Sequence, residues 1–192
     1  MIEAYSAHPE LFDLYVSVWG HPAENLWVQD ADTTRDFHVL AFEGRSVVAR
    51  VVTLGFGSCQ SDDGIELGVE LLVVIGREEL SEIGSDRVMA FVADIGTHLL
   101  RHSVRPNEGS VIPGTSIAPW EPDALVFDLP RGEPESLEDF VADGRALRLI
   151  CAIPVYADEA RLVQHSGMQA LDALVEQSEF SLADVRRPSL AR

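Results

Sequence analysis

The sequence predicts an α+β fold, with a central mixed, mostly antiparallel sheet and flanking helices. Two apolar, β-branched runs, 47–56 and 65–75, alternate with a period of two residues and are separated by a short polar loop, which favours an antiparallel hairpin. A helical pattern follows over residues 88–102. A further alternating run, 147–156, precedes two more helical patterns. Strands and helices are therefore grouped along the chain, which is typical of the α+β class.

The first third of the chain is expected to hold one short helix and a three-stranded meander. Pro9–Trp19 has a proline at an early helical position and apolar residues at helical spacing, and Gly20 stops it. The polar segment 23–36 is expected to be irregular. A strand at 37–42 and a tight turn at 43–45 lead into the central pair of strands. The second run becomes apolar on both faces at its end, which predicts cover on both sides.

The rest of the chain begins with an expected acidic turn at 77–84, after which Ser85 and Asp86 suit a helix start. Segment 103–120 contains three prolines and two glycines. It is expected to be mostly loop, either throughout or interrupted by one brief strand. Pro154 demotes the end of its strand to an edge or a bulge. The other expected elements are strands at 124–129 and 147–156, one or two helical turns or an ordered loop at 136–143, and helices at 158–165 and 168–177.

Length and composition fit one globular domain. The chain has 192 residues, of which 46% are hydrophobic and 24% charged, which suffices for a core without disulfides or metal. No repeat, low-complexity segment or linker divides it. We expect a single domain over 1–192, with a core at about 37–177 and a C-terminal tail at 178–192.

The charge restricts the partners. Fourteen basic residues against 32 acidic ones give a formal net charge of −18. Phosphate contacts need a basic face, so we expect no nucleic-acid binding, and an anionic membrane surface would repel the chain. A basic protein partner would be attracted. Solubility alone explains the charge equally well, and both interpretations stay open.

Every basic side chain is arginine. A phosphate-binding P-loop lysine, a lysine Schiff base and a lysine general base are therefore excluded. Cys59 and Cys151 match no metal-binding spacing and suit a reducing compartment. The N-terminal residues lack the features of a signal peptide, and no run of eighteen residues is apolar. We expect a cytoplasmic protein.

Three features of the sequence are partly similar to catalytic or metal sites. His98 and His102 have the spacing of two zinc ligands, but no third ligand follows, so a solvated helix edge is expected. Residues 114–118 faintly match a nucleophile elbow, yet flanking prolines and the lack of a following helix argue for a loop. Cys151 lies within an alternating strand and should be a buried, inert thiol. We predict no catalytic, cofactor-binding or metal-ligating residues and no cofactor.

Four segments resemble the suppressor of fused family in its single-domain bacterial form. They are VVTLGFGSC (51–59), GVELLVVIG (68–76), LICAIPVYADEARLVQHSGMQALDALVEQ (149–177) and ADVRRPS (183–189). The last is similar to a short D-x-R-R segment of eukaryotic relatives. The loop SCQSDDG at 58–64 departs from the bacterial pattern.

The resemblance implies binding rather than catalysis. Eukaryotic members sequester a transcription factor with the help of an additional C-terminal domain. Bacterial members are commonly interpreted as immunity proteins that neutralise cognate toxins. An acidic inhibitor suits a basic toxin domain, so the charge of this chain is compatible with that role.

We predict partner binding by Asp62, Asp63, Glu66 and Trp120. An aspartate near the position of Asp62 and Asp63 contacts the bound peptide in eukaryotic relatives, although an Asp-Gly turn is the alternative explanation. Trp120 is either an interface anchor or a core residue.

The function hypothesis is a non-catalytic immunity protein that covers the surface of a toxin, through an acidic face and an exposed sheet edge that accepts a partner strand. The alternatives are a small enzyme with a site assembled from dispersed His, Asp and Ser residues, and a general cytosolic scaffold. The oligomeric state is not predicted.

Overall fold

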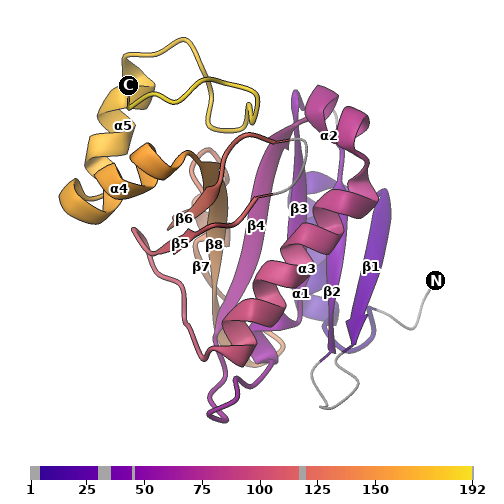
Figure 1. Ribbon diagram of the computed structural model, residues 1–192. Helices are drawn as coiled ribbons and strands as arrows, with labels where there is room; N and C mark the ends of the chain where they lie inside the picture. The colour runs from indigo at the N-terminus through magenta and orange to yellow at the C-terminus, as the bar shows by residue number, and fades with distance from the viewer. Residues whose placement is uncertain (1–4, 30–35, 45, 117–119, 192) are drawn as a thin grey trace.

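The computed structural model describes residues 5–29, 36–44, 46–116 and 120–191, which form one mixed sheet with flanking helices (Figure 1). The strands are β1 Glu24–Gln29, β2 Asp36–Phe42, β3 Val48–Leu54, β4 Val69–Gly76, β5 Val111–Pro113, β6 Ala124–Asp128, β7 Asp139–Ala142 and β8 Arg145–Val155. Their order across the sheet is β1-β2-β3-β4-β8-β6-β5, and β7 pairs with the first part of β8. Among these pairs, only β4 and β8 run parallel.

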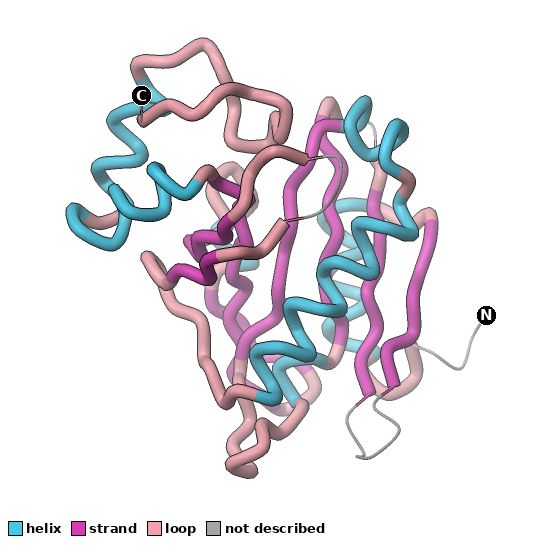
Figure 2. Tube along the Cα trace, in the orientation of Figure 1, coloured by secondary structure: helices cyan, strands magenta, loops and turns pink. Residues whose placement is uncertain are grey.

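Helices lie against both faces of the sheet (Figure 2). They are α1 Pro9–Trp19, α2 Arg77–Ile83, α3 Ser85–Arg101, α4 Ala157–Ser166 and α5 Met168–Glu176. Buried residues of α2 and α3 pack on one face, whereas α1 packs on the other. Helices α4 and α5 join the same apolar cluster as α1, beside β6 and β8. No helix within the described ranges is both long and apolar enough to cross a membrane.

The alternating pattern of the central strands divides the core into two clusters. Ala49 and Val51 of β3 contact the α3 side, and Val52 and Leu54 contact the α1 side. In β4, alternate residues likewise enter the two clusters, which confirms the predicted cover on both faces. The α+β class and the antiparallel meander β2-β3-β4 are also confirmed.

Two sequence predictions were wrong. The segment expected to be irregular contains β1, because Leu26 and Val28 alternate toward the core, while the other residues of this edge strand are polar apart from the exposed Trp27. The expected acidic turn at 77–84 is α2, in which Leu80 and Ile83, three residues apart, are buried.

Smaller differences concern the ends of elements. Strand β4 begins at Val69 rather than residue 65, and the preceding residues form only an isolated bridge between Gln60 and Glu66. A short 3-10 turn, Glu135–Leu137, and β7 occupy most of the segment expected to be helical turns or loop. Segment 103–120 contains the brief strand that was one of its two expected forms, and this strand is β5. Parts of the predictions for 23–36, 43–45, 103–120 and 114–118 lie outside the described residues.

Helix α3 approaches the sheet closely at Gly96. A Cβ atom there would lie 3.0 Å from Cζ of Phe37 and 3.2 Å from Cε2 of Phe56. We therefore expect Gly96→Ala to lower the free energy of unfolding by about 1–2 kcal/mol through overpacking, although alanine is the better helix former. Urea unfolding measures this. Asp94→Ala, at an exposed position of the same helix, is the control and should change stability by less than about 0.5 kcal/mol. Equal midpoints for the two variants would show that the contact relaxes without cost.

Candidate functional site

An acidic cleft is lined in part by the segment between β3 and β4, and Figure 1 shows this segment at the lower end of the sheet. Its volume is about 680 Å³, and its lining includes His8, Asp36, Asp62, Glu66 and Arg145. The loop that contains Asp62, between β3 and β4, is held to the end of α3, because the N–H of Asp62 donates to the carbonyl of Leu100. The carboxylate of Glu66 lies 3.7 Å from the guanidinium of Arg145, and the two side chains are 46% and 42% exposed.

The structure brings three of the four predicted partner-binding residues together. Asp62, Asp63 and Glu66 are exposed on the same loop. Trp120 lies elsewhere, in the core: its ring is 7% exposed and packs edge-to-face on Phe91 at 5.9 Å. Of the two interpretations given for Trp120, this burial favours the core residue over the interface anchor. Partner binding by the three acidic residues stays a prediction.

A buried carboxylate supports the turn that lines this cleft. Glu70 of β4 is fully buried; the hydroxyl of Thr53 donates to it at 2.5 Å, and the N–H groups of Gly55 and Gly57 donate at 3.1 and 3.0 Å. Burial raises the pKa of Glu70 to about 7, although these donors oppose the shift. Glu70 was not identified from the sequence, because alternation along β4 does not distinguish a buried glutamate from an exposed one.

The free energy of unfolding should depend on the protonation of Glu70. Its pKa of about 7 in the folded protein lies above the ordinary 4.5, so the folded state binds the proton more tightly. Stability from this group is therefore present at low pH and falls as pH rises from about 4.5 to about 7. Glu70→Gln should remove this decline, of about 3 kcal/mol. Urea unfolding at pH 4.5–8 measures it, with the exposed Glu108→Gln as control. Parallel pH profiles for wild type and Glu70→Gln would refute this.

A second feature is the wedge between β4 and β8, defined as residues 73–76 and 152–155. The two strands pair from Val69↔Arg148 to Leu72↔Cys151 and then separate (Figure 1). Beyond this point, among the residues that the structure describes, β4 pairs only with β3, and β8 only with β6. Within these residues the wedge thus leaves two strand edges inside the sheet without a neighbouring strand.

Pro154 prevents the β4–β8 ladder from continuing along the wedge. In this ladder alternate residues of β8 donate to β4, as the N–H of Arg148 does to the carbonyl of Gly68. The next donors are residues 150, 152 and 154, and Pro154 has no N–H to give to the carbonyl of Val74. The predicted edge character of this proline is confirmed, on the side that faces β4.

A mostly apolar groove of about 300 Å³ opens over the wedge. Its floor includes Val74 and Ala152, and one wall is formed by α5. The other wall includes Ser181, Leu182 and Ala183, from the segment that follows α5. Cys151 also lines the groove and is buried, as predicted; burial raises the pKa of its thiol to about 12.

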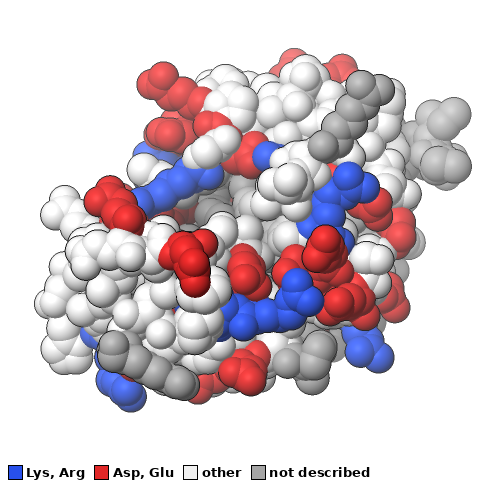
Figure 3. Space-filling view, turned by 90° about the horizontal axis from the view of Figure 1, so that it is seen from above, with Lys and Arg blue, Asp and Glu red and all other residues white. Residues whose placement is uncertain are grey.

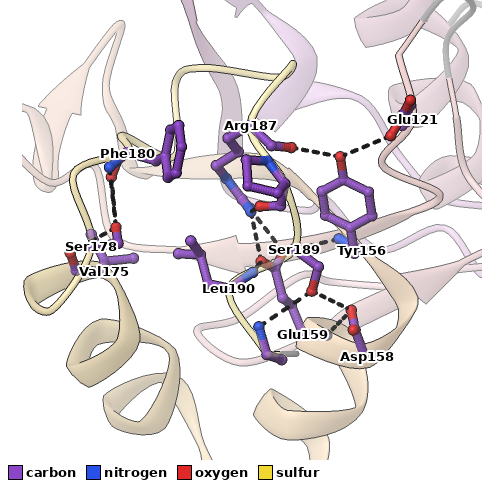
Figure 4. Close-up of polar contacts among 12 residues, drawn as sticks. Glu121, Tyr156, Asp158, Glu159, Val175, Ser178, Phe180, Arg187, Ser189 and Leu190 are labelled. Carbon is purple, nitrogen blue, oxygen red and sulfur yellow. Dashed lines mark hydrogen bonds and ion pairs between the residues drawn. The ribbon is translucent and has the colours of Figure 1, made fainter.

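The segment after α5 is anchored by a buried ion pair (Figure 4). The guanidinium of Arg187 donates to both carboxylate oxygens of Glu159, at 2.6 and 2.8 Å, and the two side chains are at most 1% exposed. The N–H of Leu190 donates to the same carboxylate, and the hydroxyl of Tyr156 donates to the carbonyl of Arg187. Residues expected to form a tail are therefore packed on α4.

Acidic and basic side chains alternate over the end of the molecule that carries α2 and this segment (Figure 3). Arg186 lies there beside the carboxylates of Glu79 and Glu82, at 2.6 and 3.3 Å. The surface charge of this end is therefore mixed.

The rings of His98 and His102 lie 4.4 Å apart on α3. Within the described part of the chain, no group of three or more His, Cys, Asp or Glu residues is arranged to hold a metal ion.

Comparisons with solved structures identify this architecture. The fold matches a protein described as a SUFU homolog from Neisseria gonorrhoeae FA 1090 with a TM-score of 0.69 and 13% identity, over 95% of this chain and 96% of that one. It matches a chain of the Sufu–Fu complex with a TM-score of 0.68 and 12% identity, over 97% of this chain and 91% of that one. Drosophila Suppressor of Fused gives 0.66 and 12%, over 95% of this chain and 50% of that one.

The fold is thus that of a class of proteins in which one member is seen in a complex with another protein. The family model of the suppressor of fused protein (SUFU) matches residues 33–188. The chain belongs to the suppressor of fused family. No curated protein matches the sequence significantly.

Proposed function

We propose that this protein is a non-catalytic binding module that takes an extended segment of a partner protein into the wedge between β4 and β8. The observation that carries the proposal is the early end of the β4–β8 ladder beneath an apolar groove. Strand addition uses main-chain hydrogen bonds for affinity and side-chain pockets for specificity, and the wedge and groove supply both kinds of contact.

The geometry of the wedge favours one orientation of the partner strand. Strands β4 and β8 run parallel to each other. A strand between them is therefore either parallel or antiparallel to both, and antiparallel pairing is the more stable per residue. Alternate side chains of that strand would point into the groove, where Val74, Ala152 and Val175 favour an apolar side chain.

The finer proposal is that the partner is a basic toxin domain and that the protein acts as an immunity protein in the cytoplasm. The net charge of −18 supports attraction of a basic partner rather than of nucleic acid or an anionic membrane. The exposed acidic loop with Asp62, Asp63 and Glu66 would speed the encounter, and strand addition would then hold the partner with its working surface covered.

The experiment that tests the function is capture of partners by the tagged protein from its own cells, followed by mass spectrometry. A stoichiometric toxin domain supports the immunity role. Recovery of the bait alone, or of metabolic enzymes, contradicts it.

The groove predicts a variant that loses the partner. Val175 of α5 lines the groove and is half-buried, so Val175→Arg places an unpaired charge against the incoming side chain. We expect about tenfold less captured partner. Ala173→Arg, on the exposed face of the same helix, is the matched control and should capture normally. Normal capture by Val175→Arg would show that the partner binds elsewhere.

The acidic loop predicts an effect on association rate. We expect Asp62→Asn with Asp63→Asn to slow association with the captured partner about threefold at low salt, because complementary charge mainly raises the on-rate. The difference should vanish above about 0.5 M salt. Stopped-flow or surface-based kinetics measure it. Asp13→Asn with Asp94→Asn removes the same charge at exposed positions of α1 and α3. An equal loss in both double variants would mean that total charge, and not this loop, governs the rate.

A further inference from the structure

The segment that follows α5 crosses the open end of the wedge. The N–H of Gly76, at the end of β4, donates to the carbonyl of Ala183 at 3.0 Å. Ser181, Leu182 and Ala183 also form one wall of the groove. One carbonyl of this segment therefore takes the place that a carbonyl of an inserted strand would take.

The hydrogen-bonding direction of β4 supports this comparison. The carbonyl of Gly68 accepts from the N–H of Arg148 in β8, so the peptide groups of the even-numbered residues of β4, Val74 among them, face β8. Strand residues two apart direct their peptide groups to the same side. Gly76 therefore faces the wedge as Val74 does, and its partner there is Ala183 instead of a strand.

The anchors of this segment differ in strength along its length. Its end is held by the buried pair of Arg187 and Glu159 and by the hydroxyl of Ser189, which donates to Asp158 at 2.8 Å. The residues before Arg187 are held by Val185, which is 2% exposed in the core, and by Arg186, whose 51% exposed side chain contacts the buried Glu79 and the exposed Glu82 of α2. Burial of one valine and partly exposed ion pairs contribute less than it costs to break a fully buried pair, so these residues release more readily than the end at Arg187.

We propose that residues 178–186 form a displaceable strap, fixed at α5 and at Arg187, that closes the wedge until a partner strand replaces it. The nature of the incoming strand rests on the proposed function, whereas the local opening of the strap does not. Only molecules with an open strap can bind the partner. The apparent affinity is therefore the affinity of the open form multiplied by the fraction of molecules that are open. Contacts that hold Arg186 to Glu79 and Glu82 therefore set how readily the site accepts a partner.

Amide hydrogen exchange measured by NMR on the whole chain tests the strap. We expect the Gly76 amide to exchange together with the amides of the strap through a local opening, faster than the amides of β3. Arg186→Ala should speed exchange at Gly76 about fivefold, and Glu82→Gln should speed it less. Arg161→Ala, which removes the same charge from an exposed position of α4, should leave it unchanged.

The strap proposal is overturned if Gly76 exchanges only with global unfolding in wild type and in Arg186→Ala. It is also overturned if Arg161→Ala speeds exchange as much as Arg186→Ala, because the effect would then reflect charge alone. Failure of the proposed function is separate. Normal capture by Val175→Arg refutes partner binding at the wedge even where the strap opens, and loss of capture with a strap that never opens refutes the strap alone.

Discussion

A parallel ladder between Val69–Leu72 and Arg148–Cys151 joins the two halves of the sheet, and both candidate sites lie at its ends. One half is the meander with β1; the other contains β5, β6, β7 and β8. The ladder contains Glu70, whose carboxylate organises the turn beside the acidic cleft. It stops before Pro154, and the wedge begins there. If the ladder were longer, β4 and β8 would pair along the wedge, and neither strand would have a free edge there for a partner strand.

Two buried carboxylates serve this arrangement in different ways. Glu70 accepts hydrogen bonds from neutral donors and has a pKa raised by burial. Glu159 instead faces the guanidinium of Arg187 and receives a further N–H from Leu190. Desolvation offsets much of the attraction in a buried ion pair, so its main effect is to fix position. Here it fixes where the strap ends, while the partly exposed contacts of Arg186 leave the preceding residues easier to release.

Local pattern predicted most of the fold. Alternation along β3, β4 and β8 and helical spacing in α1 and α3 were sufficient, because each buried face repeats within one element. Strand β1 was missed since Leu26 and Val28 are its only apolar residues besides the outward Trp27. Helix α2 was missed because three glutamates in seven residues masked the pair Leu80 and Ile83.

The sites were predicted only in part, for a related reason. The loop acids could be found because they are neighbours in sequence. The partners of Glu70 and Arg187 could not, because satisfying a buried charge depends on residues that only the fold brings together. Pro154 was the exception. A proline has no N–H to donate, so a proline inside a predicted strand indicates from sequence alone that one side of the strand lacks a hydrogen bond there.

The ladder also bears on how the chain folds. The meander and α3 are built from contacts between near neighbours in sequence. The ladder between β4 and β8, in contrast, joins residues that are far apart along the chain. Such non-local pairing is slow to form. During synthesis and refolding, the apolar inner edge of β4 is therefore exposed before its neighbour arrives, and in that interval it is the part of the molecule most prone to pair with another chain.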